Sequence, residues 1–136
     1  KHGQHTDERE KMVYLYEASR GLFYLHQKLC VHRDLAARHC LISAHGQIKI
    51  AHFDRAWLID PDYYNKDDEI SMNKAASNAP VRWRAPETLH EDAQTFSCAS
   101  DIRAFGVVAY EVFSNGMAPW PADPDEEVAA RIRKGG

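Results

Sequence analysis

Residues 100–114 constrain the fold of this chain more than any other segment, because they predict a helix that is apolar on nearly every side. This helix is expected to end at Asn115 and Gly116, which directly follow its last apolar turn. A helix without a polar face has to be surrounded by other elements, so we expect it to lie at the centre of the domain. Its longest apolar run, 105–113, is broken by Glu111 and is much shorter than the ~20 residues of a bilayer span, so no membrane span is predicted.

A second helix is predicted near the start of the chain. Between Met12 and Leu25 apolar residues recur every three or four positions, which is the period of a helix with one face in a core. Asp7 and Glu10 have the spacing of a capping box at its N-terminus. We therefore expect a helix that begins just after Asp7 and buries one apolar face.

Shorter apolar runs follow this helix. They predict a β-hairpin over 41–50, with Gly46 as the left-handed residue of its turn. Residues 55–78 then lose all periodicity and gather acidic side chains, so they predict a long exposed loop. Loops of that length are usually functional or disordered.

The last element is a helix predicted over about 124–134, with Asp123 as its N-cap, Pro124 at its first position and Gly135 beyond its end. The order helix, hairpin, loop, helix, helix indicates an α+β domain that is mainly α.

Composition restricts the class of protein further. The 136 residues suffice for one core but not for a two-lobed enzyme. Lys plus Arg number 17 against 20 Asp plus Glu, and the formal net charge is -3 without a dense basic run, so nucleic acid is not expected as a partner. The cysteines, Cys30, Cys40 and Cys98, are odd in number and lack Cys-x-x-Cys spacing, which favours a reducing, cytoplasmic environment over a disulfide framework.

Four short motifs carry most of the functional information. Residues 32–41 read His-Arg-Asp-Leu-Ala-Ala-Arg-His-Cys-Leu, and residues 49–54 read Lys-Ile-Ala-His-Phe-Asp. Residues 81–87 read Val-Arg-Trp-Arg-Ala-Pro-Glu, and residues 100–106 read Ser-Asp-Ile-Arg-Ala-Phe-Gly. In sequence and in order, these motifs closely resemble the catalytic loop, the metal-binding strand end, the end of the activation segment and the start of the central helix of protein tyrosine kinases. The closing segment, 118–135, has some resemblance to Fes/Fer-like cytoplasmic kinases, and the subfamily stays open.

The resemblance implies that residues 1–136 form part of a tyrosine kinase catalytic domain, namely a C-terminal lobe truncated at both ends. No Gly-rich loop and no Val-Ala-Ile-Lys strand precedes Lys1, so we expect the small lobe that covers the ATP phosphates to be absent from this chain. The implied parts are the helix before the catalytic loop, the catalytic loop 32–41, the activation segment 52–87, the central helix at about 100–114 and the following helix at about 124–134.

The resemblance also implies the family reaction, transfer of the γ-phosphoryl group of ATP to a tyrosine of a protein or peptide, with magnesium as cofactor. Asp34 stands where the family keeps the aspartate that accepts the substrate proton, and Arg38 stands where tyrosine kinases help to place the substrate ring. The two positions that hold magnesium in kinases are here His39 and His52. Because magnesium prefers oxygen ligands, we expect metal affinity and activity to be weak or lost.

Two alternatives concern this altered metal position. Asp54 could substitute as an oxygen ligand, because it follows His52 by two residues and alternate residues of an extended backbone share a side. His39 and His52, if the fold brings them to Asp34, could bind a softer metal such as zinc. Otherwise they are two solvated or core histidines, and the sequence confirms no metal site.

Regulatory and substrate-binding residues are implied as well. Tyr63 and Tyr64 stand where many tyrosine kinases carry activation-loop tyrosines, and a phosphate there could pair with Arg33. The alternative is two tyrosines in an acidic loop without a regulatory role. Pro80 and Trp83 match the stretch that forms a platform for the substrate tyrosine, unless Trp83 simply packs under the loop.

Three functional hypotheses follow from these residues. The first is a tyrosine kinase with Asp34 as base, and the second is a pseudokinase-type docking or regulatory module, which His39 and His52 favour. The third is a non-functional partial copy. The expected absence of half of the family fold favours this third hypothesis, and so does Arg103, which replaces the usual tryptophan of the central helix and costs stability unless it meets a carboxylate. Glu87 adds to this expectation, because the arginine that pairs with it in the family would lie beyond Gly136.

Overall fold

The structure is a computed structural model, and it describes residues 7–59, 62, 66–76, 78–90 and 95–135. The mainly helical α+β class expected from the sequence is confirmed. In the described part of the chain, no helix is both long enough and apolar enough to cross a bilayer. The elements are α1 (Glu8–Gln27), β1 (Cys30–Val31), η1 (Ala37–His39), β2 (Cys40–Ile42), β3 (Ile48–Ile50), β4 (Trp57–Leu58), α2 (Lys66–Ala76), η2 (Val81–Trp83), η3 (Pro86–Thr88), α3 (Cys98–Phe113) and α4 (Asp125–Arg133), where η denotes a 3-10 helix.

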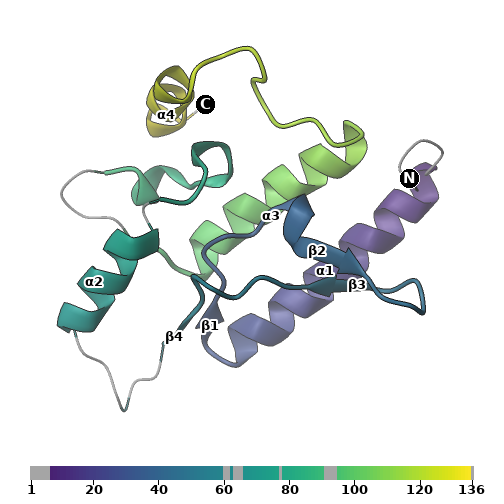
Figure 1. Ribbon diagram of the computed structural model, residues 1–136, viewed down its shortest axis with the longest axis horizontal. Coiled ribbons are helices and arrows are strands. Elements are labelled where there is room, and N and C mark those ends of the chain that lie inside the picture. The colour runs from purple at the N-terminus through teal and green to yellow at the C-terminus, as the bar shows by residue number, and fades with distance from the viewer. Residues whose placement is uncertain (1–6, 60–61, 63–65, 77, 91–94, 136) are drawn as a thin grey trace.

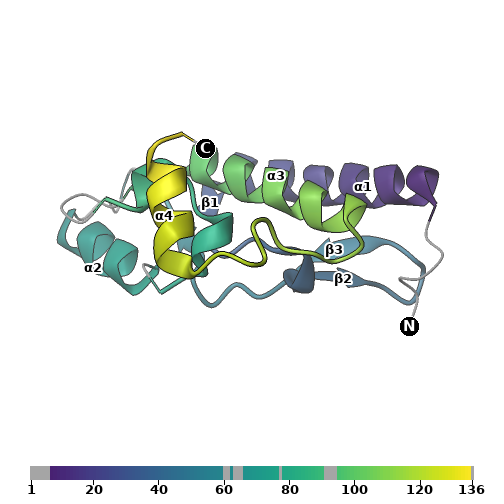
Figure 2. The same ribbon diagram turned by 90° about the horizontal axis from the view of Figure 1, so that it is seen from above.

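The two long helices, α1 and α3, lie side by side and form the body of the molecule (Figures 1 and 2). The β2–β3 hairpin is antiparallel, pairs Cys40 with Ile50 and packs against α1. Strands β1 and β4 form a second antiparallel pair, with Cys30 opposite Leu58. Helix α4 packs against η2 and η3, while α2 lies at the left of Figure 1.

The main core holds the predicted catalytic loop between these two helices. Leu22 of α1 and Ala104 and Val108 of α3 cluster with Leu35, which directly follows Asp34 and is 1% exposed. Burying a leucine side chain is worth about 1.5–3 kcal/mol relative to leaving it exposed. The backbone beside Asp34 is therefore fixed by apolar packing on both sides.

Helix α1 begins where the sequence predicts. Asp7 is its N-cap and accepts a hydrogen bond from the backbone N–H of Glu10 at 2.8 Å, which is one half of the expected capping box. Ala18 and Leu22 are buried in α1, as the periodicity predicts. Met12 is 59% exposed, so the prediction that the apolar face extends over the whole helix is wrong at its first turns.

Helix α3 starts two residues earlier than expected, at Cys98. Ser97 and Ser100 form a reciprocal capping box at this end, which supplies partners for backbone N–H groups of the first turn. The expectation of a helix surrounded on every side is wrong for the residues that the structure describes. One face contacts α1 and the loop, whereas Ile102 and Tyr110 are 57% and 46% exposed.

The long loop predicted over 55–78 is also wrong in part. It contains the short strand β4, which pairs with β1, and the helix α2. Periodicity could not reveal α2, because Ile70 and the charged residues described along it are exposed. Charges near the two ends stabilise α2 instead. Asp67 and Asp68 lie in its first turn and Lys74 lies in its last turn, where each charge complements the helix dipole.

Helix α4 begins one residue later than predicted. Pro124 is the N-cap instead of Asp123, and its carbonyl accepts from the backbone N–H groups of Glu127 and Val128 at 3.1 Å each. Gly135 follows the helix with a φ of 87°, in the left-handed region that glycine enters without a steric cost.

Candidate active site

The loop that carries Asp34 is anchored by a buried carboxylate of α3. Asp101 is 1% exposed, and its two oxygens accept hydrogen bonds from the backbone N–H groups of His32 at 2.8 Å and Arg33 at 3.0 Å. Nε2 of His26 lies 3.0 Å from Oδ2 of the same carboxylate. A carboxylate shared by α1, α3 and the loop fixes the register of these three elements, because each hydrogen bond to a charged group contributes about 1.5–3 kcal/mol.

A second carboxylate of α3 joins the loop to the segment around Trp83. Oε2 of Glu111 accepts from the backbone N–H of Ala37 at 2.8 Å and from the indole Nε1–H of Trp83 at 2.9 Å. The guanidinium of Arg38 lies over the Trp83 ring, 4.9 Å from its centroid. Arg38 and Trp83 therefore form one rigid surface beside the loop.

Asp34 itself is buried and surrounded by cationic groups. Nη1 of Arg55 donates to its Oδ2 at 2.7 Å, and Nη2 of Arg38 lies 3.8 Å from its Oδ1. Its backbone N–H donates to Nδ1 of His32 at 3.2 Å. Because Nε2 of His32 lies 2.8 Å from the carbonyl of Ala51, which only accepts, His32 is protonated at Nε2. The carboxylate is thus held in place on a fixed backbone, and its negative charge is neutralised mainly by Arg55.

The fold brings His39 and His52 together beside Asp34. Their rings stack with centroids 4.1 Å apart and planes at 10°. Nδ1 of His39 lies 2.7 Å from the backbone carbonyl of Asp34, and Nε2 of His52 lies 3.6 Å from Asp34 Oδ2. Burial lowers the pKa of His39 below its usual value, although the Asp34 backbone and carboxylate act in the opposite direction. His52 adopts a φ of 66°, in the left-handed region that residues other than glycine rarely enter.

Magnesium, which the resemblance implies, does not fit the side chains gathered here. Asp34, His39 and His52 offer one carboxylate and two imidazoles, whereas magnesium requires a near-octahedral set of oxygens. Asp54 adds a carboxylate 3.7 Å from Nε2 of His52, but its side chain is 81% exposed. A softer ion that accepts nitrogen ligands suits this set better.

Arg33, the expected partner of a phosphate in the activation segment, lies buried near two aromatic rings. It is 6% exposed, with its guanidinium 5.6 Å from the Trp57 ring and 5.9 Å from the Phe96 ring. Its Nε donates to the carbonyl of Arg55 at 2.5 Å. Burial lowers its pKa, with Asp101 acting in the opposite direction. The tyrosines predicted to act with it, Tyr63 and Tyr64, lie outside the described residues, so this pairing stays a prediction.

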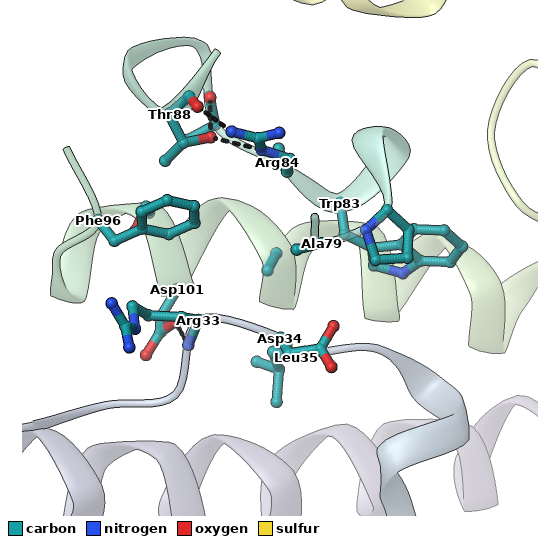
Figure 3. A pocket seen from close by; sticks show the side chains of 13 residues that line it. Arg33, Asp34, Leu35, Ala79, Trp83, Arg84, Thr88, Phe96 and Asp101 are labelled. Carbon is teal, nitrogen blue, oxygen red and sulfur yellow. Dashed lines mark hydrogen bonds between the residues drawn. The ribbon is translucent and has the colours of Figure 1, made fainter. Parts of the chain in front are cut away.

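The predicted substrate platform borders a pocket next to Asp34. Pro80 is exposed, whereas Trp83 is half-buried and packs against the main core. In Figure 3 the Trp83 side chain lies across this pocket from Asp34 and Leu35, with Phe96 and Arg33 at the other end. The indole of Trp83 is tied to the core and also borders the pocket, and its role as a substrate platform stays a prediction.

Three residues that shape this site received no role from the sequence. Arg55 follows the last motif residue, Asp54, in a stretch without periodicity, so nothing in the sequence indicated a partner for it. Asp101 and Glu111 are acidic residues at buried positions of a mainly apolar helix. That contrast is a usable signal, because a charged residue at a core position is retained only when it is paired or hydrogen-bonded.

Comparison with known proteins agrees with this geometry. Residues 1–136 match the family model described as protein tyrosine and serine/threonine kinase. The chain is 38% identical over 127 residues to vascular endothelial growth factor receptor 2 of Coturnix japonica, covering 91% of this chain and 9% of the receptor. It is 36% identical over 123 residues to Fer-related kinase 1 of Caenorhabditis elegans, covering 90% of this chain and 29% of that kinase. To human vascular endothelial growth factor receptor 1 it is 36% identical over 125 residues, covering 90% of this chain and 9% of the receptor.

The chain thus spans between 9% and 29% of the length of these relatives. The matched region includes the anchored loop, the stacked histidines and the central helix. This chain belongs to the protein tyrosine kinase family, and its mainly helical architecture is that of the family's C-terminal lobe.

Proposed function

We propose that this chain is the substrate-facing lobe of a protein tyrosine kinase domain in which magnesium-dependent transfer of phosphate to tyrosine is weak or lost. The observation that carries this proposal is the environment of Asp34, whose carboxylate is paired with Arg55 and flanked by His39 and His52. The remaining features of the lobe support recognition of a protein partner that presents a tyrosine.

The ion pair with Arg55 opposes the role of a general base. The family reaction requires a carboxylate that accepts the hydroxyl hydrogen of tyrosine. Oδ2 of Asp34 already accepts from a guanidinium at 2.7 Å, so a substrate hydroxyl has to compete for the same oxygen. A charge-assisted hydrogen bond is roughly twice as strong as a neutral one, which places the hydroxyl at a disadvantage.

The two imidazoles oppose the metal-dependent part of the reaction. Kinases of this family use ATP with magnesium, and the metal neutralises the charge that develops on the phosphates. His39 and His52 replace the two oxygen ligands, and a neutral imidazole holds magnesium poorly. The family implies ATP as the cofactor. For this member we propose that the protein binds the magnesium ion of magnesium–ATP only weakly.

The second candidate function is a docking or regulatory module, and the surface formed by Arg38 and Trp83 favours it. Glu111 holds this surface through two hydrogen bonds that need neither metal nor nucleotide. The surface formed by Arg38 and Trp83 would contact an extended segment of a protein rather than a nucleic acid, since the chain has a net charge of -3. The free state of Cys30, Cys40 and Cys98 supports a cytoplasmic setting for this function.

The test compares the natural full-length protein with a restored variant that carries His39→Asn, His52→Asp and Asp54→Gly. Tyrosine phosphorylation of a Glu-Tyr copolymer is measured with ATP and magnesium. We expect the restored variant to be at least about 100-fold faster, which corresponds to about 2.7 kcal/mol of transition-state stabilisation. Equal and substantial rates of both proteins would contradict the proposal.

A binding measurement separates the remaining hypotheses. Affinity for a tyrosine-containing peptide is measured without nucleotide for the natural protein and for Trp83→Ala. Peptide binding that depends on Trp83, together with slow phosphorylation, supports the docking module. A folded protein that neither binds the peptide nor phosphorylates it is the result expected of a non-functional partial copy.

A further inference from the structure

The ligand-forming atoms of Asp34, His39 and His52 lie within 4.8 Å of one another, so modest shifts of these side chains would bring all three to one ion. Two ligands about 2.1 Å from a tetrahedral zinc ion are about 3.4 Å apart. Nε2 of His52 and Oδ2 of Asp34 are 3.6 Å apart, so only small shifts are needed for both to reach one ion. From this arrangement we infer that Asp34, His39 and His52 bind a zinc ion.

The hydrogen bond of His39 already prepares that ring for a metal. Its Nδ1 lies 2.7 Å from the backbone carbonyl of Asp34, and a carbonyl oxygen only accepts. Nδ1 therefore carries the proton, and Nε2 carries the free lone pair. Histidines that bind metals in proteins nearly always donate their other ring N–H to a carbonyl or carboxylate, which fixes the tautomer and orients the ring.

His52 supplies the accessible ligand of the site. Its side chain is 42% exposed, and its Nε2 lies between two carboxylates, 3.6 Å from Asp34 Oδ2 and 3.7 Å from Asp54 Oδ2. Both distances exceed the ~3.2 Å limit of an ordinary N–H···O hydrogen bond, so neither contact ties up this nitrogen. The exposure gives the ion an entry path and leaves the fourth zinc position to water.

The donor set selects the metal. One carboxylate and two neutral imidazoles form the combination that catalytic zinc sites use with an open fourth position. Magnesium prefers oxygen and keeps most of its water, so it binds such a set weakly. Calcium is excluded on the same ground, because it requires six or more oxygen ligands.

Two features of the metal-free site have to change when zinc binds. The imidazole planes differ by only 10°, so their lone pairs are nearly parallel and the rings have to tilt before both reach one ion. Arg55 donates to Oδ2 of Asp34 and places a positive charge beside the site. Zinc and Arg55 therefore compete for the same carboxylate, and removing Arg55 should raise the affinity for zinc.

The experiment uses the natural full-length protein without ATP, magnesium or substrate, so its outcome does not depend on the proposed kinase function. Zinc affinity is measured by competition with a chromophoric chelator for the wild type, His52→Ala, His39→Asn and Arg55→Ala. His45→Ala is the matched control, because His45 is exposed in the β2–β3 turn, away from this cluster. Cobalt is used as a spectroscopic substitute, since a tetrahedral site gives intense visible absorption.

We expect His52→Ala and His39→Asn each to weaken the affinity of one zinc equivalent by at least ~100-fold, because loss of an outer-shell partner alone costs 10–100-fold. His45→Ala should leave it unchanged, and Arg55→Ala should strengthen it. The intense cobalt absorption should disappear with His52→Ala.

Circular dichroism of His52→Ala checks that this variant is folded. We expect it to fold normally, because the substitution removes an exposed side chain. Zinc affinities of wild type and His52→Ala within twofold of each other would overturn the inference, as would loss of zinc with His45→Ala alone.

Discussion

Nη1 of Arg55 donates a hydrogen bond of 2.7 Å to Oδ2 of Asp34, whose side chain is only 3% exposed. The guanidinium side chain is 31% exposed, so the pair joins a buried acid to a partly solvated base. This arrangement occupies Oδ2 of the carboxylate and leaves Oδ1 as its more available oxygen. The same pair therefore limits both the use of Asp34 as a base and its use as a metal ligand.

Arg55→Leu should destabilise the domain by about 1–3 kcal/mol, because it leaves a buried carboxylate without its nearest donor. Arg38→Leu is the matched control, since Arg38 lies 3.8 Å from the same carboxylate and its side chain is 45% exposed. That control should cost less than about 1 kcal/mol. Urea-induced unfolding of the domain measures both effects. An equal loss in the free energy of unfolding for the two variants would show that Arg55 does not stabilise Asp34 more than Arg38 does.

Asp101→Leu should release the loop from α3. The substitution removes the acceptor of the His32 and Arg33 backbone N–H groups, and both amides then remain unpaired in the interior. We expect a loss of about 3–5 kcal/mol in the free energy of unfolding, because a buried charged acceptor with several partners is removed. Hydrogen exchange of residues 32–34 in the native protein should accelerate as well.

Asp125→Leu is the control for this change, because Asp125 is an exposed carboxylate at the start of α4. It should leave the exchange of residues 32–34 unaltered. Unchanged exchange in the Asp101 variant would mean that packing of Leu35, rather than this carboxylate, holds the loop.

The parts of the fold that the sequence predicted are those with a local signal. Capping by Asp7 and the turn at Gly46 depend on a few neighbouring residues, and both agree with the structure. Helix α2 was not predicted because the residues described along it are exposed and mostly polar, so the helix shows no hydrophobic period and depends on helix propensity and on charges near its ends. The site shows the same contrast. The motifs identified Asp34, His39 and His52 as candidate site residues. The contact between Arg55 and Asp34 depends on the path of a segment without periodicity, so the sequence could not predict it.

Arg103→Leu should stabilise the domain by about 1 kcal/mol. Nε of Arg103 is the one buried side-chain nitrogen without a hydrogen-bond partner in the described part of the chain, which agrees with the destabilising effect expected of a cation in the central helix. Removing an unsatisfied buried donor relieves a desolvation cost of about 1–3 kcal/mol, part of which is offset by lost packing of the arginine stem. The midpoint of thermal unfolding measures the change.

Arg20→Leu serves as the control for Arg103, because Arg20 is exposed on α1. Its effect should stay within about 0.5 kcal/mol. A lower stability of the Arg103 variant would indicate that the guanidinium makes a favourable contact through its other nitrogens.

Cys40 should resist alkylation although it directly follows the metal-site candidate His39. Burial raises the pKa of its thiol to about 11, with a smaller contribution from the charge of Glu111, and its Sγ–H donates to the carbonyl of Ala36 at 3.6 Å. At pH 8 the thiolate fraction is then about 100-fold lower than for a thiol of pKa 9, so iodoacetamide should label Cys40 about 100-fold more slowly in the native protein than in urea. Because the folded-state pKa is raised, this thiol favours the folded state below pH 9, and the contribution is lost as pH rises from 9 through 11.

Mass spectrometry of the labelled peptides provides the labelling rates of Cys40. Cys30 and Cys98 serve as internal references, because burial also raises their pKa values. Labelling of native Cys40 at the urea rate would show that the thiol is open to solvent and ionised, and then it would compete with His39 for zinc.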